Sequence, residues 1–105
     1  MRFLETRIFT DAIADLISDD DYAALQAALI SRPHLGVLIP GGGGIRKLRW
    51  HVPGRGKRGG LRVIYFWEPQ PEVFFMLYAY PKSERDDLSR LQLRLLRRIA
   101  EQELS

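Results

Sequence analysis

Residues 61–80 read LRVIYFWEPQPEVFFMLYAY, and this stretch decides the fold. Residues 61–67 and 73–80 are runs of apolar, β-branched and aromatic residues on either side of a turn at residues 68–72 that contains two prolines. Such runs around a turn predict two antiparallel β-strands. Because both runs are apolar at successive positions, we expect both strands to lie in the centre of a sheet, covered by helices on one side.

A third strand is expected at residues 45–52, because alternate residues of this segment would point to opposite faces of a sheet. The two faces hold alternate residues: Arg46, Leu48 and Trp50 on one face, and Ile45, Lys47, Arg49 and His51 on the other. Residues 33–44 end in four consecutive glycines and form a connector in which we expect no regular structure.

The remaining expected elements are a short strand and three helices. Residues 1–6 predict the strand, residues 8–17 a first helix with an apolar stripe, and residues 19–31 a second helix. Ser18 is expected to cap the second helix, because its hydroxyl can accept hydrogen bonds from free amides of the first turn. Residues 83–103 predict a last helix, with one apolar face formed by Leu88, Leu91, Leu95 and Ile99.

We therefore expect residues 1–105 to form a single α+β domain with the order β-α-α-β-β-β-α. It contains a small antiparallel β-sheet meander, two N-terminal helices packed on it, and a C-terminal helix at its edge. With no cysteine and only two histidines, we expect neither a disulfide nor a structural metal. No apolar leader and no run of the roughly 20 apolar residues needed for a membrane span is visible, which predicts a cytoplasmic protein.

Charge is distributed unevenly along the chain. Residues 22–67 contain eight Lys and Arg and no Asp or Glu, a charge of +8, while the other residues include eight basic and thirteen acidic ones, a charge of −5. A merely solvated charged surface usually mixes both signs. The exclusion of acids over 46 residues therefore favours a polyanionic partner, and nucleic acid in particular.

The basic loop at residues 54–60, GRGKRGG, lies inside this window. Its glycines let backbone amides approach a phosphate, and Arg55, Lys57 and Arg58 supply positive charge. The loop has the spacing of neither a Walker motif nor a dinucleotide-binding loop. The alternative interpretation is a solvent-exposed hairpin kept soluble by its charges.

Arg62 follows the loop inside a predicted central strand, on the same face as Ile64 and Phe66. A guanidinium in such a place needs an anionic partner, because an unpaired buried charge is costly. The sequence leaves two kinds of partner open. One is a carboxylate of the chain, such as Glu68, Glu72 or an acid of a helix, and the other is an external anion at the open edge of the sheet.

Tyr80 and Lys82 share one face at the end of the last predicted strand. Lysines and Arg62 nearby are expected to lower the pKa of Tyr80 from about 10, so that it can act as a base. The alternative is a buried tyrosine with a satisfied hydroxyl. His51, just before the basic loop, is a further candidate proton carrier, although no acid–base partner is evident.

Four segments follow one another as IRKLR (residues 45–49), GRGKRGG (54–60), LRVIY (61–65) and YPKSERDDL (80–88). Together they resemble the RelE/HigB superfamily of toxins from bacterial type II toxin–antitoxin modules, most closely its HigB-like branch, over nearly the whole chain. The resemblance implies a RelE-like fold and an mRNA interferase that cleaves messenger in the ribosomal A site without a cofactor. It also implies a cognate antitoxin, expected to be a helix-turn-helix protein, through which the toxin contacts operator DNA.

By position, Arg62 matches the strand arginine that is expected to stabilise the scissile phosphate. Lys57 and Arg58 match the family's basic loop, and Tyr80 and Lys82 match a pair at the end of the strand. The reaction implied is attack of a ribose 2′-hydroxyl on the adjacent phosphate, for which cations can stabilise the added charge without a metal.

This chain departs from the RelE branch at Ser83 and Ser89, where that branch has an arginine and a tyrosine. The tyrosine proposed there as general base is absent, and Tyr80, Lys57 or Lys82 would take its part. The predicted catalytic residues are Lys57, Arg62, Tyr80 and Lys82, and the predicted RNA- or ribosome-binding residues are Arg46, Lys47, Arg49, Arg55 and Arg58.

Two other functions stay open from the sequence. One is a non-catalytic module that binds RNA or DNA through the same basic loop. The other is an inactive toxin relative that acts only in antitoxin pairing and operon autoregulation.

Overall fold

The computed structural model describes residues 1–52 and 60–104. Within these ranges the elements are β1 (Arg2–Glu5), α1 (Arg7–Leu16), α2 (Asp19–Ser31), β2 (Val37–Leu38), β3 (Arg46–His51), β4 (Gly60–Glu68), β5 (Val73–Pro81) and α3 (Arg90–Leu104). This order confirms the predicted α+β class and adds the short strand β2. No helix in the described part of the chain is long and apolar enough to cross a membrane.

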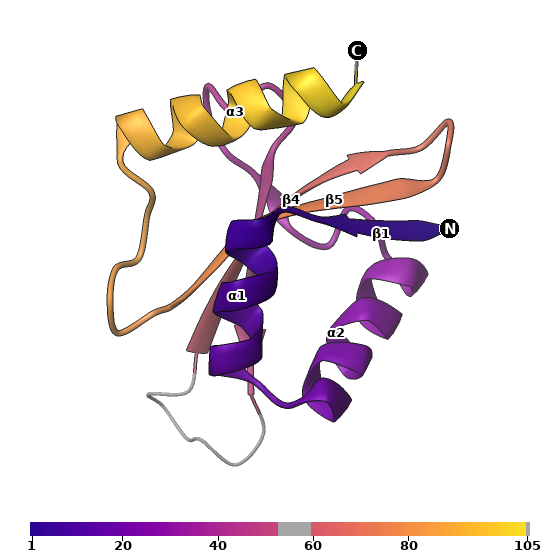
Figure 1. The fold of residues 1–105 in the computed structure, drawn as a ribbon, viewed down its shortest axis with the longest axis vertical. Helices are drawn as coiled ribbons and strands as arrows, with labels where there is room; N and C mark the ends of the chain where they lie inside the picture. The colour runs from indigo at the N-terminus through magenta and orange to yellow at the C-terminus, as the bar shows by residue number, and fades with distance from the viewer. Residues whose placement is uncertain (53–59, 105) are drawn as a thin grey trace.

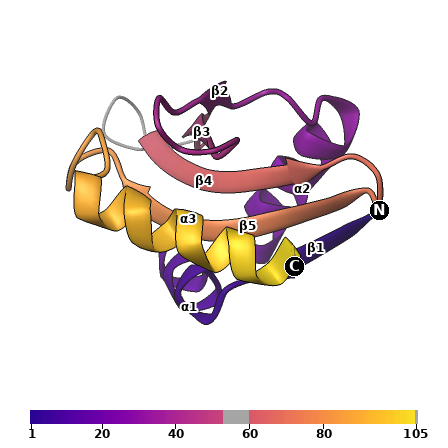
Figure 2. The same ribbon diagram turned by 90° about the horizontal axis from the view of Figure 1, so that it is seen from above.

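The strands form one sheet in the order β1-β5-β4-β3-β2, which Figure 2 shows from above. Strands β3, β4 and β5 make the predicted antiparallel meander, and β2 extends it on one side. On the other side β1 pairs in parallel with β5, so that Arg2 lies beside Val73. The sheet is therefore mixed, with β4 and β5 near its centre.

The two N-terminal helices pack on one face of the sheet, as predicted (Figure 1). Phe9 and Ile13 of α1 and Leu25 and Leu29 of α2 are buried there. They share one hydrophobic cluster with strand residues such as Val63. Burial of this apolar surface is the main stabilising contribution on that face.

α3 packs on the opposite face, where Leu96 and Ala100 share a separate cluster with Ile64 (Figure 1). The predictions that this helix lies at the edge, and that helices cover one side only, are therefore wrong. Strands that are apolar on both faces need cover on both to remove that surface from water. The predicted apolar stripe is also wrong in part, because Leu91 and Leu95 are exposed.

A β-bulge in β5 changes which of its side chains face α3. The pairing of β4 with β5 shifts between Ile64 and Tyr65, which leaves Leu77 as the extra residue. A shift of one residue exchanges the two faces of a strand. Past the bulge, Tyr80 consequently lies on the α3 face, the face that also carries Arg62.

α3 begins at Arg90, not at Ser83 as predicted. Ser89 precedes it as a cap: the Gln92 amide donates to Ser89 Oγ at 3.1 Å, and the Ser89 amide donates to Gln92 Oε1 at 2.9 Å. This reciprocal pair satisfies amides that a helix start leaves free, and such a cap contributes about 1 kcal/mol. Asp86 and Asp87, which precede the cap, therefore lie outside the helix, where they contact Arg62 and Lys47 of the sheet.

The connector at residues 33–44 contains β2, contrary to the prediction. The Tyr65 hydroxyl donates to the Pro33 carbonyl at 2.8 Å and accepts from the Gly36 amide at 2.9 Å. The Arg46 guanidinium donates to the Gly36 carbonyl at 2.7 Å. These long-range bonds hold the connector beside β3, and local sequence patterns do not show them.

Candidate active site

Residues that pair across the meander form a row on the α3 face. Arg49 of β3 pairs with Arg62 of β4, and Arg62 pairs with Tyr80 of β5. Directly paired residues of antiparallel strands point to the same face. Arg49 is exposed, whereas Arg62 and Tyr80 are buried. The structure therefore brings Arg62 and Tyr80, both predicted site residues, side by side.

The next row contains His51, Gly60 and Lys82. His51 pairs with Gly60, and the Lys82 amide donates to the Gly60 carbonyl at 2.9 Å. Because glycine has no side chain, the row is open in its middle: a Cβ at Gly60 would lie 3.4 Å from Lys82 Cδ and 3.7 Å from Arg62 Nη1. The result is the Gly60 hollow, about 310 Å³ in volume and lined by Arg49, Trp50, His51, Gly60, Arg62 and Lys82.

The Gly60 hollow is strongly cationic. Its described lining includes Arg49, Arg62 and Lys82 and has no carboxylate. A concave surface of one sign concentrates ligands of the opposite charge, and an arginine presents a planar fork that matches phosphate oxygens. Within the described ranges, no group of three or more His, Cys, Asp or Glu is arranged to hold a metal ion. The hollow therefore has the charge and the planar fork that suit a phosphate, and Lys82 and His51 in its lining are side chain types that can carry protons.

Arg62 has an ionic partner in the chain, Asp86. Arg62 Nε and Nη2 both donate to Asp86 Oδ1, at 3.1 and 2.8 Å. The Arg62 side chain is 7% exposed and that of Asp86 is 55% exposed. The hydrogen bond from Arg62 holds the pKa of Asp86 below its ordinary value, so the carboxylate is ionised at neutral pH. Of the two partners that the sequence left open, the structure contains the carboxylate of the chain.

The predicted lowering of the Tyr80 pKa is wrong. Burial raises the pKa of Tyr80 from 10.0 to about 12; Asp87 adds to this, and Arg62 opposes it only in part. The Tyr80 hydroxyl donates to the Asp86 carbonyl at 3.1 Å. Tyr80 is therefore a neutral hydrogen-bond donor at pH 7, which makes it unsuited to act as a base.

We expect the Tyr80 hydroxyl to ionise near pH 12, where its raised pKa lies. The pKa of Tyr80 in the folded protein exceeds the ordinary value of 10.0, so the neutral buried hydroxyl is favoured by folding. Its contribution to the free energy of unfolding is complete below pH 10.0 and is lost as the pH rises through about 12. An alkaline titration of tyrosinate absorbance, taken as the difference between the wild type and Tyr80→Phe, isolates this group. A midpoint at or below the ordinary value would contradict the burial of the hydroxyl.

The predicted RNA-binding residues lie in different places. Arg46 lies on the opposite face and bonds to the Gly36 carbonyl, and the Lys47 side chain, which is 14% exposed, pairs with Asp87. Arg49 is exposed and lines the Gly60 hollow. Three predicted residues lie outside the described part of the chain: Arg55, Lys57 and Arg58.

Gly60 and Asp86 were not among the predicted site residues, and His51 was predicted only as a further candidate proton carrier. His51 and Gly60 form the open row, and Asp86 holds Arg62. The signal for the first two is the register of the strands that flank the basic loop, which a sequence does not fix by itself. Asp86 could have been found from the capping pattern of Ser89 and Gln92, which ends the loop and starts the helix.

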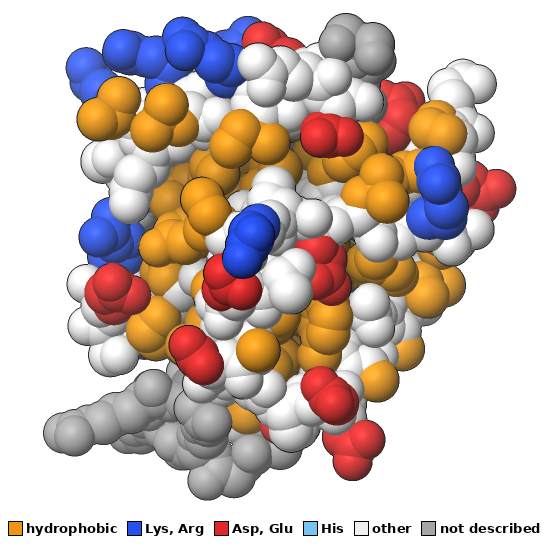
Figure 3. Space-filling model, in the orientation of Figure 1, with side chains coloured by type: hydrophobic (Ala, Val, Ile, Leu, Met, Phe, Trp, Pro, Cys, Tyr) orange, Lys and Arg blue, Asp and Glu red, His pale blue; other side chains and the backbone are white. Residues whose placement is uncertain are grey.

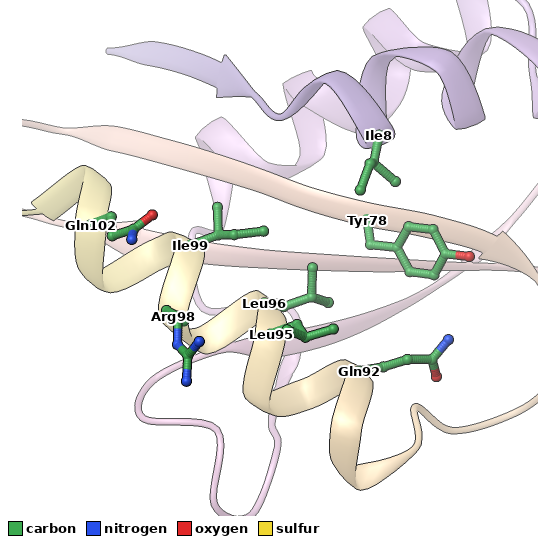
Figure 4. A pocket seen from close by; sticks show the side chains of 8 residues that line it. All are labelled: Ile8, Tyr78, Gln92, Leu95, Leu96, Arg98, Ile99 and Gln102. Carbon is green, nitrogen blue, oxygen red and sulfur yellow. The ribbon is translucent and has the colours of Figure 1, made fainter.

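A larger hollow lies between α1 and α3. It has a volume of about 420 Å³, and Ile8 of α1, Tyr78 of β5 and Leu95 and Ile99 of α3 line it (Figure 4). Figure 3 shows hydrophobic side chains gathered below α3 and basic side chains over one end of the helix, whose basic residues are all arginines. This hollow is mainly apolar, so it offers packing surface and few groups that can do chemistry.

A family model described as the RelE toxin of the RelE/RelB toxin–antitoxin system matches residues 1–105. The match spans the whole chain, and the α+β architecture with its mixed sheet is consistent with a RelE-like fold. The narrower assignment to the HigB-like branch stays a prediction. The chain belongs to the RelE toxin family, whose toxins are paired with an antitoxin.

Proposed function

We propose that the chain is a ribosome-dependent mRNA interferase, which cleaves messenger RNA in the ribosomal A site and is neutralised by its cognate antitoxin. The observation that supports this most strongly is the Gly60 hollow, where Arg49, Arg62 and Lys82 surround one cavity. Membership of the RelE toxin family supports the antitoxin partner. A helix-turn-helix antitoxin would also connect the toxin with operator DNA.

The proposed reaction begins with a phosphodiester bound in the Gly60 hollow. The ribose 2′-oxygen bonds to phosphorus, its proton passes to a base, and the bond from phosphorus to the 5′-oxygen breaks. An acid protonates that oxygen, so the products are a 2′,3′-cyclic phosphate and a 5′-hydroxyl. Arg62 stabilises the negative charge that develops on the phosphate oxygens, and Arg49 binds the backbone beside it.

Lys82 and His51 are the described proton carriers of the hollow. An imidazole can accept and return a proton near neutral pH, whereas a lysine is suited to protonate a leaving oxygen. Lys57 of the basic loop, a predicted catalytic residue, is a third proposed proton carrier. Tyr80 supports the site as a neutral donor to the Asp86 carbonyl.

The ribosome would supply the orientation of the messenger that the toxin alone does not impose. Cleavage requires the 2′-oxygen, the phosphorus and the 5′-oxygen to lie in line, and holding reactants in such a geometry removes much of an activation barrier. The described lining of the hollow offers contacts to one phosphate, so it does not by itself hold a flexible RNA in line. The proposal places the toxin in the cytoplasm, where ribosomes work.

The test is to mix the purified protein with ribosomes that carry a defined messenger and to map the 5′ ends that are produced. We expect cuts at the A-site codon when ribosomes are present and slow or no cleavage of the same RNA alone. A non-catalytic binding module, or a relative that acts only in antitoxin pairing, would give no codon-positioned cuts. That outcome would overturn the proposed function.

A further inference from the structure

Two edges of the Arg62 guanidinium face different surroundings. Nε and Nη2 both donate to Asp86 Oδ1, at 3.1 and 2.8 Å. Nη1 lies on the other side, 3.7 Å from the point that a Cβ at Gly60 would occupy, and Arg62 lines the Gly60 hollow. Among the described residues, Nη1 has no hydrogen bond of its own. A guanidinium has five donors in a planar fork, so one edge can hold a carboxylate while another meets a second anion.

Asp86 does not line the Gly60 hollow, and its position is fixed by the neighbouring strands. Its carbonyl accepts from the Tyr80 hydroxyl at 3.1 Å and from Lys47 Nζ at 3.4 Å. Lys47 also forms an ion pair with Asp87. Residues of β3, β4 and β5 thus hold this acidic segment beside Arg62. A phosphate can enter the hollow without displacing it.

We propose that Asp86 is a positioning residue for phosphate binding. It holds the Nε–Nη2 edge of Arg62, and this turns the Nη1 edge into the Gly60 hollow, towards Lys82. Asp86 itself does not touch the ligand. The inference rests on the proposed function in one respect, since it takes the ligand of the hollow to be an RNA phosphodiester.

Removing the Asp86 carboxylate should change the affinity for a phosphate in the direction opposite to that expected from charge alone. Removing a carboxylate from a cationic surface should strengthen the binding of an anion. If Asp86 orients Arg62, its removal should weaken binding instead, because the guanidinium loses its fixed direction. Asp87 provides the matched control: it carries the same charge one position away and pairs with Lys47, not with Arg62.

The experiment is calorimetric titration of the full chain with a short 2′-O-methyl RNA oligonucleotide, which lacks the nucleophile and stays intact. All titrations use one salt concentration, because phosphate contacts are salt-dependent. We expect Asp86→Ala to bind about tenfold more weakly than the wild type, which corresponds to one charge-assisted hydrogen bond. Asp87→Ala should bind at least as tightly as the wild type.

Asp86→Asn should restore most of the affinity, because its amide oxygen can accept from the same two nitrogens. The Nε–Hε resonance of Arg62 in a nitrogen–proton correlation spectrum should persist in Asp86→Asn and broaden or disappear in Asp86→Ala. If Asp86→Ala unfolds, Asp86→Ser replaces it in both measurements. A role confined to stability would move the unfolding temperature but not this order of affinities.

Two results separate this inference from the proposed function. Asp86→Ala binding as tightly as Asp87→Ala, or more tightly, would overturn the positioning role and leave the hollow as a phosphate site. Arg62→Ala binding the probe as the wild type does, or no binding by the wild type, would remove the phosphate site itself, and the positioning role with it.

Discussion

Replacing Arg62 by alanine is expected to slow the cleavage of ribosome-bound messenger by about 10²–10³-fold, the usual effect of removing a donor that stabilises a transition-state charge. Arg62 is the buried cation of the Gly60 hollow, and its direction is set by Asp86. Single-turnover rates with saturating ribosomes measure this step. Arg62→Lys should also be slow, because an ammonium keeps the charge but loses the fork that can hold Asp86 and a phosphate together.

Arg32→Ala is the matched control for this prediction. Arg32 belongs to the same carboxylate-free window but directly follows α2, which packs on the opposite face of the sheet. Its removal should leave the single-turnover rate nearly unchanged. An Arg62→Ala protein that cleaves at the wild-type rate would show that the phosphate is stabilised elsewhere.

Phe74→Ala is expected to lower the free energy of unfolding by about 3 to 5 kcal/mol, the range for truncating a buried aromatic residue. Phe74 is 0% exposed, and its ring lies 4.7 Å from that of Phe3 and 4.3 Å from that of Trp67. These contacts join β1, β5 and β4. Because small domains are stable by only about 5–15 kcal/mol, this loss is a large share of the total.

Chemical denaturation of the wild type and of Phe74→Ala measures this difference. Leu38→Ala serves as the comparison, because Leu38 lies on the short edge strand β2 and is 53% exposed. It should cost well under about 1 kcal/mol, as surface substitutions usually do. Equal losses in the two variants would contradict the position of the core under α1 and α2.

The strands of the meander and the cap of α2 could be predicted from the sequence because their signals are local. Apolar runs around a proline-containing turn gave β4 and β5, and the Ser18 hydroxyl accepts from the Asp21 amide as expected. The place of α3 could not be predicted in this way. Its side of the sheet depends on which surface the other helices leave uncovered, and that is a property of the assembled fold.

Prediction of the candidate site was also limited by contacts that form only in the assembled fold. Arg62 and its need for an anion were evident from a charge inside an apolar strand, and an acid of a helix was among the partners considered. Asp86 itself was not singled out, because its place beside Arg62 depends on where α3 begins. The raised pKa of Tyr80 depends on burial and on the neighbouring carboxylate of Asp87. Sequence neighbours indicated only the surrounding positive charge. The bulge at Leu77, which sets the face of Tyr80, had no recognisable signal.

In the proposed function, messenger is cleaved by its own 2′-hydroxyl while a phosphate is held at Arg62. The most direct measurement uses ribosomes programmed with two messengers that differ only in one 2′-deoxynucleotide immediately before the scissile phosphate. We predict that the wild-type protein cuts the unmodified messenger at that position and leaves the modified one intact there. Cleavage of both messengers at the same rate would rule out attack by the 2′-hydroxyl, because the modified one has no nucleophile at that position.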